Sequence, residues 1–311
     1  MTDLHLNSSA ETLYDKVTAP KLISAVILIL AFLFGLIMNC LYIWVLRFRM
    51  PQSVSTTWFL HLIITNLIFT FDMPFLAAYV LQHPRWTFGS IMCKFNNVLV
   101  EVCSYAAVFF LTAISLERFL LVFHPVWCRK HLNARCASVI CLFLWGLAFL
   151  CSSPYLVLCN LEHVKNVTVC CSEFTISWRE GPSQKLGHTF RWSLFLFHLS
   201  LCFLIPFSVI ALCHLQIACK IKQDRLTKSS KPYKLIGVVI ISFFVCWTPY
   251  HIRDAMNVEK DKFGEEVLQA LIVLSTCFTC INCCFTPLLY LFIVDSFNKE
   301  FKKAIQLFCP F

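Results

Sequence analysis

The sequence is poor in charge and in glycine. Only 14% of its 311 residues are Asp, Glu, Lys or Arg, and only seven are glycine, whereas 59% are hydrophobic. Soluble domains carry about 25% charged residues, so this balance excludes an ordinary soluble fold. Glycine-rich phosphate loops and the Gly-x-Ser-x-Gly and His-Glu-x-x-His motifs of common enzyme classes are also missing. The composition therefore favours a membrane protein that is not an enzyme.

Long apolar segments predict where the chain crosses the membrane. A spanning helix needs roughly 20 apolar residues. Seven segments are long enough, and one of them, 91–123, carries Lys94, Glu101 and the pair Glu117-Arg118. Charge inside a span is costly enough to mark a functional site. We therefore expect an all-α membrane protein, a bundle of seven transmembrane helices. The six charge-free segments are 22–46, 50–71, 136–161, 192–219, 235–252 and 267–294.

These segments divide the chain into an N-terminal segment (1–21), a transmembrane domain (22–294) and a tail (295–311). In the tail, apolar residues recur every four positions at Phe297, Phe301 and Ile305 with lysines between them, which predicts a short amphipathic helix on the membrane surface. Cys309 follows it as a candidate palmitoylation site. An unmodified terminal cysteine is the open alternative. The spanning helices are expected at about 22–48, 54–81, 90–123, 136–159, 192–220, 232–256 and 265–293.

Charge predicts the orientation. With the N-terminus outside, the inner loops hold 14 basic residues against three acidic ones, as the positive-inside rule requires. The two glycosylation sequons, at Asn7 and Asn166, then both lie outside. No cleavable signal peptide precedes residue 22, so the first helix is expected to act as the signal anchor. The net charge of +9 belongs to the inner face, which favours contact with anionic membrane lipid over nucleic-acid binding.

Most of the 19 cysteines lie inside apolar segments, where cysteine acts as a small hydrophobe. Three are placed differently. Cys93 begins the third helix on the outer side, and Cys170 and Cys171 lie in the longest outer loop, in an oxidising compartment. We predict a disulfide from Cys93 to this pair and favour Cys171 over Cys170.

A series of short motifs indicates a family. Each occurs on its expected helix, and together they resemble the rhodopsin-like (class A) G-protein-coupled receptors. His124-Pro125-Val126-Trp127 resembles the chemoattractant branch, which includes formyl-peptide, chemerin and anaphylatoxin receptors, and segments 41–48, 228–234 and 240–247 resemble one orphan receptor in it. The motifs are Asn39, Trp86-Thr87-Phe88-Gly89, Glu117-Arg118-Phe119, Trp145, Pro154, Pro206, Phe243 to Tyr250 and Pro287-Leu288-Leu289-Tyr290.

The resemblance implies a chemoattractant-like receptor in the plasma membrane. It would bind an extracellular peptide or lipid mediator and signal to a heterotrimeric G protein of the inhibitory type, with arrestin as a second partner and no cofactor or metal. The alternative is a decoy receptor that binds and internalises its ligand without activating a G protein.

The same resemblance implies an activation and coupling set. An Arg at the inner end of an apolar helix needs a partner, and Glu117 can pair with Arg118 in the resting state. Prolines within helices remove a backbone hydrogen bond and create hinge points. The predicted set is Glu117, Arg118, Phe243, Trp247, Pro249, His214, Pro287 and Tyr290.

Ligand contacts must come from the outer parts of the helices. Glu101 lies eight residues after Cys93 and so inside the bundle, where a carboxylate needs a cation. That cation could belong to the ligand or, alternatively, to Lys94 or Arg253. Asp72 beside Pro74 is a further candidate from the second helix. The predicted ligand-binding set is Glu101, Asn97, His198, Tyr250, His251, Arg253, Asp254 and Thr276.

The sequence also departs from the family pattern. The positions that hold a sodium ion in most members are Asn66, Ala107 and Thr286 here, which offer no carboxylate to a cation. His214 replaces the usual Tyr of the fifth helix. These departures favour the decoy alternative, whereas Arg118 and Tyr290 oppose it.

Overall fold

The computed structural model describes residues 18–82, 85–164, 167–170, 183–223, 230–259 and 262–293. Four predicted sites lie outside these residues: Asn7, Asn166, Cys171 and Cys309. The predicted amphipathic helix of the tail lies outside them as well.

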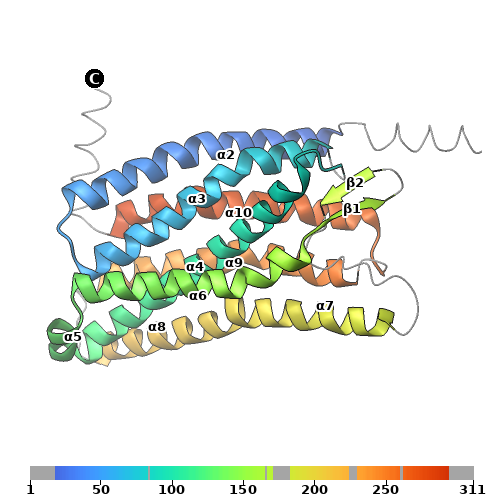
Figure 1. Ribbon diagram of the computed structural model, residues 1–311. Helices are drawn as coiled ribbons and strands as arrows, with labels where there is room; N and C mark the ends of the chain where they lie inside the picture. The colour runs from blue at the N-terminus through green and yellow to red at the C-terminus, as the bar shows by residue number, and fades with distance from the viewer. Residues whose placement is uncertain are drawn as a thin grey trace, which may run out of the picture.

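The described chain forms seven long helices in one bundle, as the sequence predicts (Figure 1). Two of them contain a π-helical turn, η1 (Val45–Arg49) and η2 (Ser200–Leu204). The helices are α2 (Ala19–Trp44) continuing as η1, α3 (Val54–Gln82), α4 (Gly89–Phe123), α6 (Ala134–Leu158), α7 (Ser183–Leu199) continuing through η2 into α8 (Ile205–Gln223), α9 (Ser230–Val258) and α10 (Glu265–Ile293).

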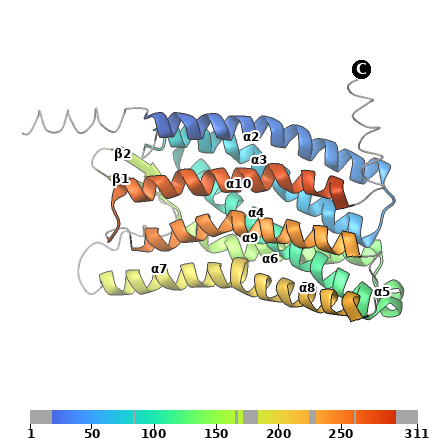
Figure 2. The ribbon, with the colours of Figure 1, turned by 180° about the vertical axis from the view of Figure 1, so that it is seen from behind.

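A short helix and a hairpin mark the two ends of the bundle. Helix α5 (Pro125–His131) follows α4 directly at one end, which we call the α5 end. Strands β1 (Leu161–Val164) and β2 (Val167–Cys170) pair antiparallel at the opposite end, the hairpin end (Figure 1). In Figure 2, α10 lies between α2 and α9. The bundle therefore closes through contacts between the first and last helices.

Local sequence explains several helix boundaries. Pro20 lies in the first turn of α2, where its missing N–H removes no helical hydrogen bond. Asn133 caps α6, its side chain accepting a hydrogen bond from the backbone N–H of Cys136. The fifth spanning helix begins at Ser183, earlier than the predicted residue 192. Its first part contains the charged residues Lys185 and Arg191, so it was not recognised as part of an apolar segment, although Lys and Arg are compatible with a helix.

Burial separates the helix that carries charge from those that face lipid. In the most apolar part of α4, 67% of residues are buried, against 22–50% in the four other apolar spans. Large apolar side chains on the outer helices are exposed, among them Leu142 (72%), Phe143 (66%) and Ile37 (66%). Such exposure suits contact with lipid, because there is no water in the hydrocarbon core. The charged side chains of α4 can therefore be paired inside the bundle.

Candidate functional site

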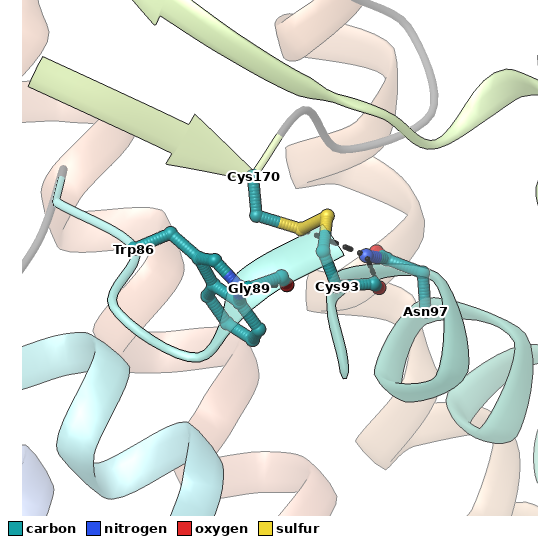
Figure 3. Close-up of a disulfide and its surroundings, with 5 residues drawn as sticks. All are labelled: Trp86, Gly89, Cys93, Asn97 and Cys170. Atoms are coloured by element: carbon teal, nitrogen blue, oxygen red, sulfur yellow. Dashed lines mark hydrogen bonds between the residues drawn. A yellow bond between two sulfur atoms is a disulfide. The ribbon is translucent and has the colours of Figure 1, made fainter. Parts of the chain in front are cut away.

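A disulfide fixes the hairpin to the start of α4 (Figure 3). Cys93 bonds to Cys170 at the end of β2, and the Asn97 amide donates hydrogen bonds to the Cys93 carbonyl (2.8 Å) and to the Cys170 sulfur (3.3 Å). The Trp86 indole donates to the carbonyl of Gly89, whose φ of +77° suits glycine, and the Trp86 backbone N–H donates to the Thr168 carbonyl. The hairpin is thereby held over one side of the bundle end.

The preference for Cys171 was wrong. Cys170, the last residue of β2, forms the bond to Cys93, and Cys171 lies outside the described residues. Cys170 pairs with Leu161 in the hairpin and is buried against Cys93 and Trp86. Composition alone could not distinguish two adjacent cysteines, because the choice depends on how the paired strands lie beside the start of α4.

A cavity of about 720 Å³ lies beneath the hairpin. Its wall includes Trp86 and Cys170 near the hairpin and Trp247 deeper in the bundle. The structure brings five of the predicted ligand-binding residues to this wall: Asn97, Tyr250, Arg253, Asp254 and Thr276.

The other three, Glu101, His198 and His251, lie behind Tyr250. The Tyr250 hydroxyl donates a hydrogen bond to one Glu101 oxygen at 2.8 Å, and His198 Nδ1 lies 2.9 Å from the other. Glu101 and His198 are 1% and 2% exposed. The His251 ring lies 5.3 Å from the His198 ring. Glu101 is thus held inside the bundle by a hydrogen bond from Tyr250 and an ion pair with His198, rather than by Lys94 or Arg253.

Arg253 and Asp254 form a second charged pair, on the cavity wall. The Arg253 guanidinium donates two hydrogen bonds to Asp254, at 2.8 and 3.1 Å, and lies 4.4 Å from the centre of the Tyr250 ring. The ring face attracts the cation. Asp254 is 3% exposed, so its charge is neutralised where water is scarce.

Asp72 on α3 also lines the cavity and is 2% exposed. Within the described part of the chain, neither of its carboxylate oxygens has a hydrogen-bond partner. The sequence singled it out as an acid in an apolar helix, but only the tertiary structure shows that it lacks a partner.

At the hairpin end, Glu259 joins α7 to the end of α9. Its carboxylate lies 2.9 Å from the Lys262 ammonium, 2.8 Å from His188 Nε2 and 3.0 Å from the Trp192 indole nitrogen that donates to it. Hydrogen bonds from Lys262, Trp192 and His188 lower the pKa of Glu259 to about 2. Local sequence patterns do not predict these contacts, which join residues 67 and 71 positions apart.

Near the α5 end, Ser55 connects the two charged residues of α4. Its hydroxyl donates to Glu117 at 2.8 Å and accepts from Arg118 at 3.0 Å. Glu117 is 5% exposed. The predicted Glu117 and Arg118 pair is therefore linked through a residue of α3 that sequence reasoning missed.

Aromatic side chains connect the cavity to the middle of the bundle. The Trp247 ring lies 5.4 Å from Tyr250 on the cavity side and 5.7 Å from Phe243 on the other. Pro249 lies within α9, two residues after Trp247. The π-helical turn η2 ends two residues before Pro206, which cannot donate a backbone hydrogen bond.

The remaining coupling candidates are described in part. His214 Nε2 lies 3.5 Å from the Ser115 hydroxyl. Pro287 and Tyr290 belong to α10 by their backbone, and their side chains lie outside the described part, as does that of Thr286. Asn66 and Ala107 are buried, and the described residues contain no group of three His, Cys, Asp or Glu side chains that could hold a metal ion.

The comparison with known protein families agrees with this geometry. Residues 18–290 match the family model described as "7 transmembrane receptor (rhodopsin family)". The chain therefore belongs to the rhodopsin family of seven-transmembrane receptors, which confirms the predicted family and fold.

The relatives include receptors that are named as chemotactic and as chemerin-like. The chain is 40% identical to "Probable G-protein coupled receptor 33" of Pan troglodytes over 290 residues, covering 92% of this chain and 86% of that protein. It is 32% identical to human "Chemerin-like receptor 1" over 278 residues (87% and 74%). It is 33% identical to "C5a anaphylatoxin chemotactic receptor 1" of Danio rerio over 282 residues (89% and 79%).

Proposed function

We propose that this chain is a chemoattractant-like receptor of the plasma membrane with its hairpin end outside. Basic residues on α5 and at the end of α8, among them Arg129, Lys130, Lys220 and Lys222, support a cytoplasmic α5 end. The Cys93–Cys170 disulfide supports an oxidising environment at the other end. The N-terminus then lies outside.

The cavity beneath the hairpin is the proposed binding site for a peptide or lipid mediator. At about 720 Å³ it falls in the range of small-ligand sites, and it combines apolar walls with a few polar groups. Relatives named as an anaphylatoxin chemotactic receptor and a chemerin-like receptor support a chemotactic mediator.

The observation that carries the signalling proposal is the aromatic connection from the cavity through Trp247 to Phe243. A ligand that displaces Trp247 must also move Phe243, because their ring centres are only 5.7 Å apart and both are buried. Pro249 provides a hinge about which the α5-end half of α9 can swing outward. Ligand contact is thereby linked to helix movement.

Arg118 is the proposed contact for an inhibitory-type G protein. In this structure Ser55 holds its guanidinium beside Glu117. When α9 moves outward, release from Ser55 would turn Arg118 toward the opened groove, into which the C-terminal helix of a G protein can bind. Arrestin would use the same groove. His214 would line it, whereas the side chains of the other predicted lining residues, Lys231, Lys234 and Tyr290, lie outside the described part.

The test is a signalling assay in cells that express the receptor. Formylated peptides, chemerin and C5a fragments and chemotactic lipids are applied, and cyclic AMP suppression, its block by pertussis toxin and arrestin recruitment are recorded. Arg118→Ala should abolish cyclic AMP suppression. The matched control Arg49→Ala removes a charge that stacks on Trp44 at the same end, and should retain most of the signal.

Each outcome has a definite meaning. Arrestin recruitment or uptake with no G-protein signal for any ligand would support the decoy alternative. A G-protein signal unchanged by Arg118→Ala would show that the receptor class is right and the proposed role of Arg118 is wrong.

A further inference from the structure

The acidic side chains around the cavity differ in whether they have a partner. Asp254 is paired with Arg253, and Glu101 lies behind the wall between His198 and Tyr250. Asp72 is as deeply buried as these two, yet its two oxygens accept no hydrogen bond from any described residue. A buried carboxylate without donors is costly, whether it stays charged or takes up a proton.

The cavity wall near Asp72 suits a positively charged group. Asn96 lines the same cavity, and its side-chain oxygen is a second buried acceptor without a partner within the described part of the chain. Phe69, Leu76 and Val100 supply apolar surface. An ammonium or guanidinium group carries donors only, so it matches acceptors in an otherwise apolar wall.

The two basic residues on the wall do not satisfy Asp72. Arg253 donates to Asp254, and Lys21 makes no hydrogen bond to either Asp72 oxygen. Asp72 also differs from the position at which most family members bind sodium. It lies six residues beyond Asn66, which corresponds to about 9 Å along the helix.

We infer that the cavity takes a ligand with an ammonium or guanidinium group, and that Asp72 is the carboxylate that binds this group. The inference rests on the proposed function and specifies its ligand. One alternative from the sequence was that Glu101 on α4 binds the positively charged group of the ligand. The inference assigns this role to Asp72 on α3 instead.

The test measures binding to the purified full-length receptor in lipid nanodiscs, without a G protein. The probes are 4-phenylbutylamine, neutral 4-phenylbutanol and anionic 4-phenylbutyrate at equal millimolar concentration and pH 7.4. The amine should raise the midpoint of thermal unfolding, whereas the alcohol and the acid should not. Because hydrogen bonds to charged groups contribute about 1.5 to 3 kcal/mol, Asp72→Asn should weaken amine affinity about ten-fold or more.

Two variants separate charge from structure. Asp72→Glu keeps the negative charge and should retain part of the stabilisation by the amine. This variant keeps the inference testable if Asp72→Asn fails to fold. Glu101→Gln changes a buried carboxylate that is already paired, so the amine should still stabilise this variant.

Several results would overturn the inference. They are equal stabilisation of wild type and Asp72→Asn by the amine, loss of the effect in Glu101→Gln alone, and no stabilisation by the amine at all. Stabilisation by sodium chloride over N-methyl-D-glucamine chloride that depends on Asp72 would assign the site to an inorganic cation instead. Failure of the proposed signalling role would leave these binding results unchanged, so the two can be distinguished.

Discussion

Ser55 on α3 accepts a hydrogen bond from Arg118 on α4 at 3.0 Å. The same hydroxyl donates to Glu117 at 2.8 Å, so one small side chain holds both charged residues at the α5 end. These contacts join positions 62 and 63 residues apart and tie α3 to α4. In the proposed mechanism they stabilise the resting state.

Ser55→Ala should therefore raise basal signalling. It removes both hydrogen bonds, and one hydrogen bond to a charged group contributes about 1.5 kcal/mol or more, equal to about a ten-fold shift in the resting-to-active equilibrium. The measurement is cyclic AMP in cells without added ligand. Ser138→Ala is the control, because among the described residues its hydroxyl donates to the carbonyl of Ala134 within its own helix. Equal basal activity in both variants would contradict the proposed restraint.

Tyr250→Phe should lower the stability of the purified receptor. It leaves the buried Glu101 carboxylate without its donor at 2.8 Å, at a cost of about 1 to 3 kcal/mol. The thermal unfolding midpoint of the two proteins is compared. In a Glu101→Gln background the same change should cost less, because the acceptor is no longer charged, and strict additivity of the two substitutions would argue against a direct interaction.

Cys93→Ala and Cys170→Ala should each reduce surface expression. Loss of a native disulfide costs about 2 to 5 kcal/mol, and this bond connects positions 77 residues apart. Cys171→Ala should express normally, since Cys170 is the partner of Cys93. Mass spectrometry of non-reduced peptides gives a direct check: a peptide that links Cys93 to Cys171 would contradict the assignment.

Glu259 should stabilise the hairpin end over a wide pH range. Its pKa is lowered to about 2 in the folded protein by Lys262, Trp192 and His188, from an ordinary value of 4.5. A depressed folded-state pKa gives a contribution that is complete above the ordinary value and is lost as the pH falls from about 4.5 through about 2.

The difference in unfolding midpoint between wild type and Glu259→Gln should therefore be smaller at pH 3 than at pH 5. Glu162→Gln, on the hairpin strand β1, is the control for a change in net charge. A difference that is the same at pH 5 and pH 3 would show that folding does not lower the pKa of Glu259.

The sequence by itself determined the seven spans, the family and the presence of charge within α4. These features depend on local properties, because the length of an apolar segment and the cost of a charge within it can be evaluated along the chain. The same reasoning placed Asn97, Tyr250, Arg253, Asp254 and Thr276 toward the outer ends of their helices, and all five line one cavity in the structure.

The partners of the polar side chains were decided only by the tertiary structure. Glu101 contacts Tyr250 from 149 positions away, and Cys170 meets Cys93 because strand pairing holds β2 beside the start of α4. Ser55 at the start of α3 carries no local signal of its role, and only the packed helices show that Asp72 has no hydrogen-bond partner among the described residues. Hydrogen bonds act over about 3 Å, so the rotation and depth of each packed helix determine which polar groups meet.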